Sequence, residues 1–412
     1  MSALSRRFGP RVVRFGILLA LSASALLVQP AGAAQAQSGA APATIRMGTF
    51  YRTLPMLAAQ ARGFYAQQNL TVDYQQVTSS TQQFQYLRDD LYDVVQTAPD
   101  NVANYRLNGS NPLGATIDVQ GFMGMDYGLY LVVTARPGIT SIEALRGKTV
   151  SVDALASGFA YVLYKILQRH GLQRDVDYSV VSTGGVANRY TALLDGQFDA
   201  TLLSGGFETR AANTGYMLLD SVYDIASPYL GAVGAAKTAW LRQNRDVATR
   251  LIRAYYDASR WAFDPANREE AIGLLETLPN TPRALAEQLY DVQVRPGVGS
   301  VPDAGIERQA IFNVLALRAE FGGFDRPQNL EQLAGPDSGL YDLSYYRAAL
   351  ASPVAPAAPG AVAPTPPAAA APRPAAAPAQ LPRTGDLPLP FIPAAAVGLA
   401  FLVGGLIPRR CS

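Results

Sequence analysis

The sequence predicts an α/β fold of two lobes, each a mainly parallel sheet flanked by helices, with two crossings forming a hinge. Short apolar, strand-like runs alternate with longer helical patterns between residues 43 and 350. The order strand, helix, strand, helix, strand occurs twice within that region. About 300 residues lie between the two unusual ends of the chain, which is enough for two hydrophobic cores.

The first copy begins with a strand-like run at 45–50. Residues 54–65 then have a helical pattern, which closes at the turn region Arg62-Gly63. A second strand is predicted at 70–74, where Leu, Val and Tyr alternate with polar residues. These elements form one strand–helix–strand unit.

The second copy has a strand at 148–152, a helix at 159–169 and a strand at 177–181. Residues 84–95 align with residues 190–201, with aromatic, leucine, turn and aspartate positions in the same order. The match is weak residue by residue but consistent in layout. It indicates an internal repeat, with a chance similarity between two α/β units as the alternative.

Two segments are suited to crossing between the lobes. The apolar run at 127–134 is predicted to be a strand that leads into the second lobe, and 218–231 is predicted to return. The remainder, 238–350, is predicted to be mostly helical, with apolar residues at helical spacing over 244–262.

The N-terminal residues 1–36 have the pattern of a secretory signal peptide. Four arginines precede an apolar run at 15–28, and Ala34-Gln35-Ala36 is a small-x-small cleavage site. The apolar run is short for a membrane-spanning helix. The alternative is an uncleaved N-terminal anchor.

The C-terminal end contains two further segments. Residues 351–380 are almost entirely alanine and proline, which predicts an extended, semi-rigid linker. Residues 381–412 combine a pentapeptide, an apolar run at 391–407 and a basic end. The pentapeptide is Leu381, Pro382, Arg383, Thr384 and Gly385.

This arrangement resembles the LPxTG sorting signal of sortase substrates. The resemblance implies that a sortase cuts between Thr384 and Gly385 and joins the protein to the cell wall. The alternative is a permanent membrane tail. In both cases the protein is expected to be secreted and tethered to the cell surface through its C-terminus.

Composition excludes several kinds of site. The chain has one cysteine and one histidine, so an intrachain disulfide, a Cys/His metal cluster and a Cys–His nucleophile pair are excluded. A Ser-His-Asp triad would need His170, which is predicted instead to cap the end of a helix. The net charge of +2 without a basic cluster excludes nucleic acid as a partner. We expect no catalytic residue, metal or cofactor.

Four segments carry a resemblance to a known family: 62–65 (Arg-Gly-Phe-Tyr), 145–150, 194–200 and 339–345. With these segments, residues 45–350 resemble the type II solute-binding proteins of ABC importers, closest to receptors for alkanesulfonates, nitrate, taurine and thiamine-pyrimidine precursors. One departure is Asp90, where that group usually has glycine. The enzymatic pyrimidine synthases of the same superfamily carry a cysteine-rich motif that this chain lacks.

The resemblance implies a monomer that binds a small molecule between two lobes and delivers it to an ABC transporter permease. The expected ligand is a sulfonate, a thiamine or pyrimidine precursor, a flavin-like heterocycle or a similar anion. We expect the first lobe at 43–132 and 226–350, and the second at 133–225.

Ligands of open α/β sheets bind beyond the carboxyl ends of the strands, and this rule nominates the ligand-binding residues. Aromatic side chains there can stack on a flat ligand, and Ser157 precedes a helix and is either its cap or a ligand contact. The candidates are Thr49, Tyr51, Arg52, Ser79, Asp100, Asn101, Tyr130, Ser157, Gly158, Phe159 and Glu208.

The charged candidates leave the sign of the ligand open. Asp100 or Glu208 would pair with a cationic ligand, whereas Arg52 or Arg189 would suit a sulfonate or carboxylate. Two other functions compete with a receptor. One is a cleft hydrolase that uses Asp100 and Glu208. The other is an adhesive wall protein, which only the Ala/Pro-rich linker and the predicted surface anchor suggest.

Overall fold

The computed structural model describes residues 40–128, 130–336 and 338–351. The predicted signal peptide, nearly all of the Ala/Pro-rich linker and the predicted sorting signal lie outside these residues. All of the elements below belong to one compact unit.

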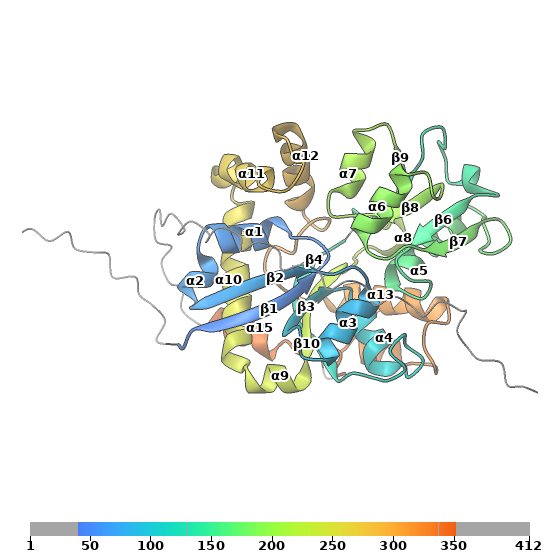
Figure 1. Cartoon of the computed structure of the whole chain (residues 1–412). Coiled ribbons are helices and arrows are strands. Elements are labelled where there is room, and N and C mark those ends of the chain that lie inside the picture. Colours follow the sequence, from blue (N-terminus) through green and yellow to red (C-terminus); the bar gives the residue numbers. More distant parts are fainter. Residues whose placement is uncertain (1–39, 129, 337, 352–412) are drawn as a thin grey trace, which may run out of the picture. The chain divides into compact units, whose positions relative to one another are not determined.

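The first lobe is built on a five-stranded sheet of order β2-β1-β3-β10-β4 (Figure 1). Strands β2, β1 and β3 are parallel, and β10 is antiparallel to both of its neighbours. The strands predicted at 45–50 and 70–74 are confirmed. The bounds are β1 (Ala43–Thr49), β2 (Leu70–Gln76), β3 (Val94–Thr97), β4 (Val119–Asp126) and β10 (Ala232–Lys237).

The second lobe repeats this arrangement in a sheet of order β7-β6-β8-β5-β9. Its first three strands are parallel, and β5 is antiparallel to both neighbours. The α/β class and the two-lobed architecture are therefore confirmed, because the strand order 2-1-3 recurs as 7-6-8. The bounds are β5 (Val132–Ala135), β6 (Thr149–Val152), β7 (Ser179–Ser182), β8 (Ala200–Leu203) and β9 (Met217–Ser221).

The strand predicted at 127–134 is wrong over its first half. The Gly128 N–H donates to the Asp126 carboxylate at 2.5 Å, and Leu131 N–H donates to the Gly128 carbonyl at 3.0 Å. These bonds turn the chain between β4 and β5, and Gly128 has a positive φ of 66°. The first crossing is this turn, and the second is the segment 222–231 between β9 and β10.

Helices follow most strands of both lobes. Those of the first lobe are α1 (Leu54–Ala61), α2 (Phe64–Gln67), α3 (Ser80–Arg88) and α4 (Pro99–Leu107). Those of the second are η1 (Glu143–Leu145), α5 (Gly158–Arg169), α6 (Val186–Leu194), α7 (Phe207–Ala212) and α8 (Tyr223–Ala226). Each parallel strand is therefore followed by a short loop and then by a helix.

Helix α5 is capped at both ends, as the sequence predicts. The Ser157 hydroxyl accepts a hydrogen bond from the Ala160 N–H at 3.1 Å. His170 is the C-cap, and its ring nitrogens lie 2.7 Å from Glu143 and 3.1 Å from Asp220. The hydrogen bond with Glu143 raises the pKa of His170. His170 therefore joins the end of α5 to two neighbouring segments.

The region after β10 is mostly helical, as predicted. The helix predicted at 244–262 is α10, which packs along α1, α2 and α15. The bounds are α9 (Thr238–Gln243), α10 (Arg245–Phe263), η2 (Pro265–Asn267), α11 (Arg268–Glu276), α12 (Arg283–Gln293), α13 (Arg308–Glu320), α14 (Leu330–Leu333) and α15 (Ser344–Ala351).

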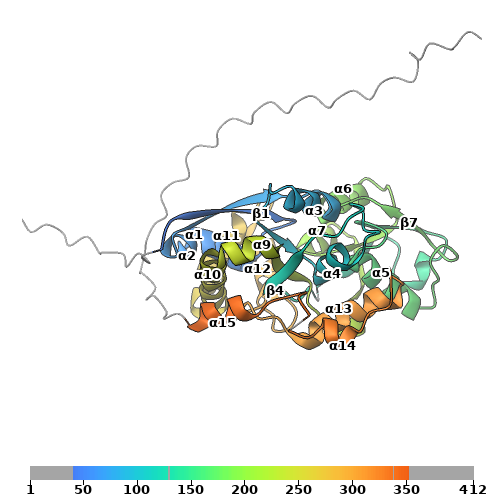
Figure 2. The same cartoon turned by 90° about the horizontal axis from the view of Figure 1, so that it is seen from below.

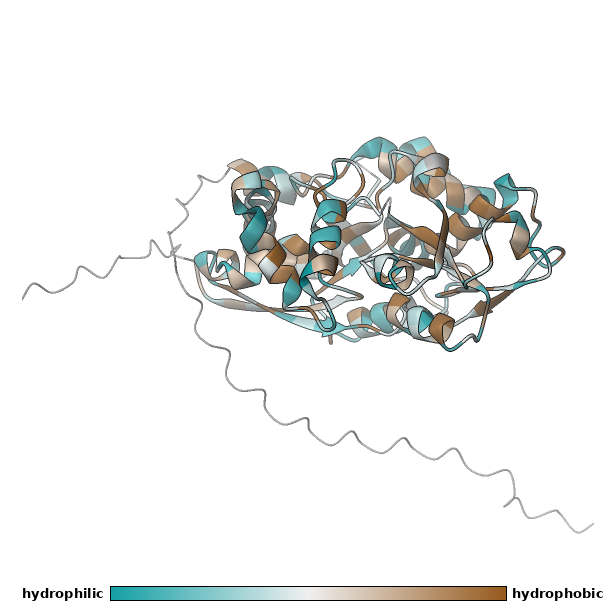
Figure 3. Ribbon diagram, turned by 90° about the horizontal axis from the view of Figure 1, so that it is seen from above, coloured by the Kyte–Doolittle hydropathy of each residue, from teal (hydrophilic) through white to brown (hydrophobic). Residues whose placement is uncertain are grey.

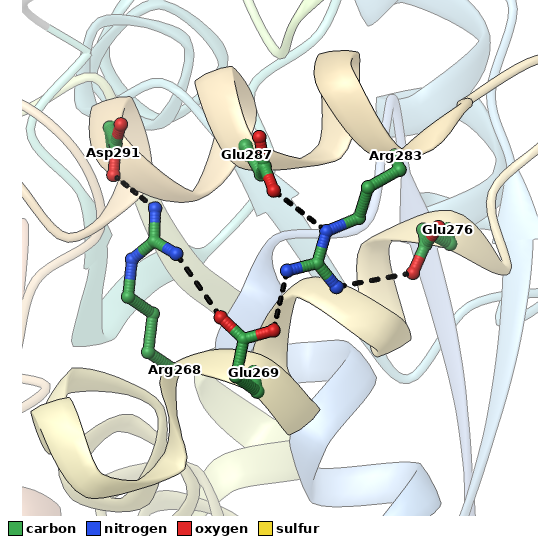
Figure 4. A network of polar contacts seen from close by, with 6 residues as sticks. All are labelled: Arg268, Glu269, Glu276, Arg283, Glu287 and Asp291. Carbon is green, nitrogen blue, oxygen red and sulfur yellow. Dashed lines mark hydrogen bonds and ion pairs between the residues drawn. The ribbon is translucent and has the colours of Figure 1, made fainter.

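A surface network of ion pairs joins α11 to α12 (Figure 4). Arg283 bonds Glu287 at 2.8 Å and Glu269 at 2.6 Å, and Arg268 approaches Glu269 and Asp291. All of these side chains are at least a third exposed, so solvent screens the pairs and each adds little to stability. The network links α11 and α12 at the surface and belongs to no binding site described below.

Apolar residues gather on the strands and on the helix faces that cover them (Figure 3). The core of the second lobe also includes Val314 and Leu317 of α13, so α13 packs against α5 as well as α4 (Figure 2). None of the helices in the described part of the chain is long and apolar enough to cross a membrane. The same residues contain no cluster of His, Cys, Asp or Glu that would hold a metal ion.

Candidate functional site

A small cavity of about 40 Å³ lies between the two lobes. It is bounded by segments that follow the carboxyl ends of strands, because parallel strands deliver their loops to the same edge of a sheet. The lining residues are Phe50, Tyr51, Gln96, Thr97, Ala98, Asn101, Asp153, Ser157, Gly158, Phe159, Gly185, Val186, Arg189, Ser204, Gly231 and Ala232.

Three helices begin at this cavity. Ala98, Ser157 and Gly185 are the N-cap residues of α4, α5 and α6, and all three line it. The first turn of a helix has N–H groups without helical partners and carries a partial positive charge. Helix starts from both lobes therefore make the cavity favourable for an anion.

Two buried donors at the cavity are incompletely bonded. Within the part of the chain that the structure describes, neither Gln96 Nε2 nor Arg189 Nε has a hydrogen-bond partner. The remaining groups of Arg189 donate to the carbonyls of Gly184 at 2.6 Å and Leu202 at 3.0 Å. Because a buried unpaired donor is costly, these groups favour a ligand that accepts hydrogen bonds.

The charge of Arg189 is not matched by a salt bridge among the described residues. Burial lowers the pKa of its guanidinium, and the Asp153 carboxylate at the same cavity partly offsets that effect. Asp153 itself accepts a hydrogen bond from the Ser157 hydroxyl at 2.5 Å. A buried positive side chain among the residues that line the cavity is favourable for an anionic group.

The lobes are closed on each other in this structure. The Gly185 N–H of the second lobe donates to the Thr78 carbonyl of the first lobe at 2.8 Å. Arg210 of α7 reaches across to Thr281, the segment before α12, at 2.7 Å. The cavity is far smaller than the roughly 300–1,000 Å³ that ligand pockets usually offer, so the lobes must separate to admit a ligand.

A buried acidic cluster lies behind Tyr51. The Tyr51 hydroxyl is 3.4 Å from the Tyr130 hydroxyl, which donates to the Asp126 carboxylate at 2.5 Å. Glu208 accepts a hydrogen bond from Gly206 N–H at 3.0 Å. Burial raises the pKa of both Asp126 and Glu208 to about 7. Among the described residues, neither carboxyl forms an ion pair with a basic side chain.

The geometry of the two lobes is shared with solved structures. The periplasmic nitrate-binding protein of Synechocystis PCC 6803 superposes with a TM-score of 0.61 at 12% identity, covering 75% of this chain and 88% of that chain. The alkanesulfonate-binding protein of Xanthomonas axonopodis pv. citri, bound to MOPS, superposes with a TM-score of 0.57 at 16% identity, covering 69% of this chain and 93% of that chain. The chain has the periplasmic binding protein fold.

Further comparisons agree with this fold. A protein of Bordetella bronchiseptica RB50 has a TM-score of 0.59 at 19% identity and covers 74% of this chain and 96% of that chain. Residues 65–227 match the family model of the phosphonate ABC transporter periplasmic substrate-binding proteins. No curated protein matches the sequence.

Of the predicted site residues, the periplasmic binding fold brings five to the cavity: Tyr51, Asn101, Ser157, Gly158 and Phe159. Thr49, Tyr130 and Glu208 are buried but do not line it. Arg52 lies beside Gln60, 3.4 Å away, and the Ser79 hydroxyl caps α3. Those two side chains are therefore engaged away from the cavity.

Asp100 is placed differently from its predicted role as the partner of a cationic ligand. Its carboxylate accepts a hydrogen bond from Arg318 of α13 at 2.8 Å, and both side chains are fully buried. A carboxylate that is already paired in the interior is not available to a ligand. Asp100 instead packs against Gly158 at the start of α5.

Sequence reasoning missed three important lining residues, Gln96, Asp153 and Gly185. Gln96 lies inside β3, and one polar residue within a buried strand does not by itself indicate a ligand contact. Gly185 follows β7, so the rule that ligands lie beyond strand carboxyl ends would have found it had it been applied to that strand.

Proposed function

We propose that the protein is the extracellular substrate-binding component of an ABC importer and captures a small organic solute with an oxyanion head group, foremost a sulfonate. One observation carries the proposal. Helix starts from both lobes meet at one interlobe cavity, and two of its lining residues, Gln96 and Arg189, each have a buried donor nitrogen without a hydrogen-bond partner among the described residues. An oxyanion has several acceptor oxygens and can therefore take hydrogen bonds from donors of both lobes.

The solved structures and the family model that resemble this chain support an oxyanion as the ligand. The structural relatives include a nitrate-binding and an alkanesulfonate-binding protein, and the matching family model is that of phosphonate receptors. Phe50, Tyr51 and Phe159 also line the cavity and offer apolar contact to the organic part of the solute. In such a receptor, ligand binding stabilises the closed lobes, and a transporter permease recognises that form.

The competing functions have less support in the geometry. A hydrolase built on Asp100 and Glu208 needs two available carboxyls, whereas Asp100 is tied to Arg318 and Glu208 is bonded to Gly206. The adhesive alternative is suggested only by the Ala/Pro-rich linker and the predicted surface anchor. Neither alternative explains the donors that remain unpaired at the cavity.

Arg189→Met tests the function. The variant is expected to bind short alkanesulfonates about 10–100-fold more weakly, because a hydrogen bond to a charged group contributes about 1.5–3 kcal/mol. Calorimetric titration of the purified chain should include sulfonates, phosphonates, nitrate, a thiamine pyrimidine and a flavin. Arg136→Met, at an exposed ion pair of the same lobe, is the matched control. Ligand converted to product, or binding indifferent to Arg189, would contradict a receptor that holds an oxyanion there.

Gly158→Ala is expected to impede closure without impairing folding. In the closed form a Cβ atom at Gly158 would lie 2.5 Å from the Asp100 Cβ, an overlap between the lobes. Overlaps of this kind cost about 1–3 kcal/mol, so affinity should fall about 5–150-fold while the ligand-free melting temperature stays unchanged. Gly273→Ala, in a helix with no atom near the added Cβ, is the control. An equal loss of ligand-free stability would show a folding defect and refute the closure role.

We further propose that the protein is exported and held at the cell surface through residues 381–412. Cleavage after Thr384 leaves a mature chain that ends at this residue and is joined to the cell wall. Mass spectrometry of the C-terminal peptide from whole cells distinguishes the two anchors. A peptide that continues past Gly385 would show a retained membrane tail instead of sortase processing.

A further inference from the structure

A second hollow lies on the first lobe and shares no residue with the interlobe cavity. Its volume is about 410 Å³. Tyr256, Arg260 and Phe263 lie on one face of α10, because residues four and seven apart share a helix face. The other walls are Asp264, Pro265, Pro302 and Asp303. We call these seven residues the α10 groove.

The aromatic side of the α10 groove is preorganised. The guanidinium of Arg260 lies 5.9 Å from the centre of the Tyr256 ring, and that of Arg253 lies 5.5 Å from it. Aromatic rings and prolines flanked by charged groups form the kind of surface that binds proline-rich segments in the polyproline II conformation. The α10 groove has no role in the interlobe site.

The described chain ends close to this groove. The Tyr346 hydroxyl of α15 lies 3.4 Å from Asp303 Oδ2, and burial with the nearby Asp303 charge raises the pKa of Tyr346 to about 12. α15 ends at Ala351, five residues later. At about 1.5 Å per helical residue, the five residues from Tyr346 to Ala351 advance about 7–8 Å along the axis of α15, so the chain leaves the helix less than two turns beyond that contact.

The sequence that follows has prolines at every third position: Pro353, Pro356 and Pro359. A polyproline II helix has three residues per turn, so that conformation would place these three rings along one edge. We propose that residues 352–359 dock in the α10 groove with this proline edge against Tyr256 and Phe263. Docking fixes the direction in which the linker leaves the first lobe.

Disulfide cross-linking of the full chain in detergent tests this docking in a Cys411→Ser background. One cysteine replaces Ala357, and the second replaces either Arg260 in the groove or Gln243 at the end of α9. Gln243 is a matched control because Arg245, beside it, contacts Ser344 at the start of α15. We expect the Arg260 pair to cross-link at least about tenfold faster, because docking raises the effective concentration. Equal rates for the two pairs would overturn the proposal.

Two further variants identify the cause of any preference. Pro353→Ser, Pro356→Ser and Pro359→Ser together leave the folded part untouched and are expected to equalise the two rates. Phe263→Ala should do the same, whereas Tyr223→Ala, an exposed tyrosine on the second lobe, should not. A preference that survives the triple proline variant would show that nearness alone, and not docking, accounts for the cross-link.

Discussion

Arg318→Met is expected to lower the free energy of unfolding by about 3–5 kcal/mol, because it leaves the buried Asp100 carboxylate without its partner. Arg318 and Asp100 are 1% and 0% exposed, and Arg318 also donates to Asn104. Asp100 lies on α4 and Arg318 on α13, which also packs against α5. The pair therefore fixes α13 at the junction of the lobes.

Urea unfolding at pH 7 measures this effect. Burial already raises the pKa of Asp100, against the opposing effect of Arg318, so loss of Arg318 favours the neutral acid. The loss of unfolding free energy caused by Arg318→Met should therefore become smaller as the pH falls. Asp100→Asn combined with Arg318→Met should recover much of the loss, and Arg146→Met at an exposed pair should cost about 0–1 kcal/mol. A loss below 1 kcal/mol for Arg318→Met would contradict a buried pair.

The acidic cluster behind Tyr51 is expected to make stability fall as the pH rises from about 4 to about 7. Burial raises the pKa values of Asp126 and Glu208 from 3.8 and 4.5 to about 7, so both remain protonated in the folded protein after the unfolded chain has ionised. The stabilising contribution of the two protonated carboxyls is fully present at pH values below the pKa values of the unfolded chain. It is lost as the pH rises through the pKa values of the folded protein. Each carboxyl contributes on the order of 3 kcal/mol.

Unfolding free energies at half-unit steps from pH 4 to pH 8 test this expectation. Asp126→Asn with Glu208→Gln should flatten the profile and raise stability above pH 7, since neutral amides replace groups that must otherwise ionise in the interior. Asp195→Asn, an exposed residue after α6, should leave the slope unchanged. A double variant with the slope of the unaltered chain would show that other groups set the pH dependence.

Much of the fold was predictable because it depends on local patterns. The strands at 45–50, 70–74 and 148–152 and the helix at 159–169 follow from apolar periodicity and capping residues, and all are present. The crossing was misplaced because Tyr127 to Val133 is as apolar as a strand. Its turn depends on the Asp126 carboxylate, whose bond to Gly128 no periodicity reveals.

The site was predictable only where it depends on topology. Loops after parallel strands supplied Tyr51, Asn101 and Ser157, which line the cavity. The role of Asp100 was not predictable, because its partner Arg318 lies 218 positions away in the sequence. Likewise, nothing in the sequence shows that Arg189 is buried beside β8 with one nitrogen unpaired.

A crystal structure of the protein grown with a short alkanesulfonate tests whether the interlobe cavity holds an oxyanion. We expect closed lobes and a sulfonate group in the interlobe cavity, within hydrogen-bond distance of Gln96 Nε2 and of Arg189. N–H groups at the starts of α5 and α6 should complete the set of donors around it. A sulfonate bound elsewhere, or an interlobe cavity that stays empty at saturating ligand, would rule out an oxyanion site between the lobes.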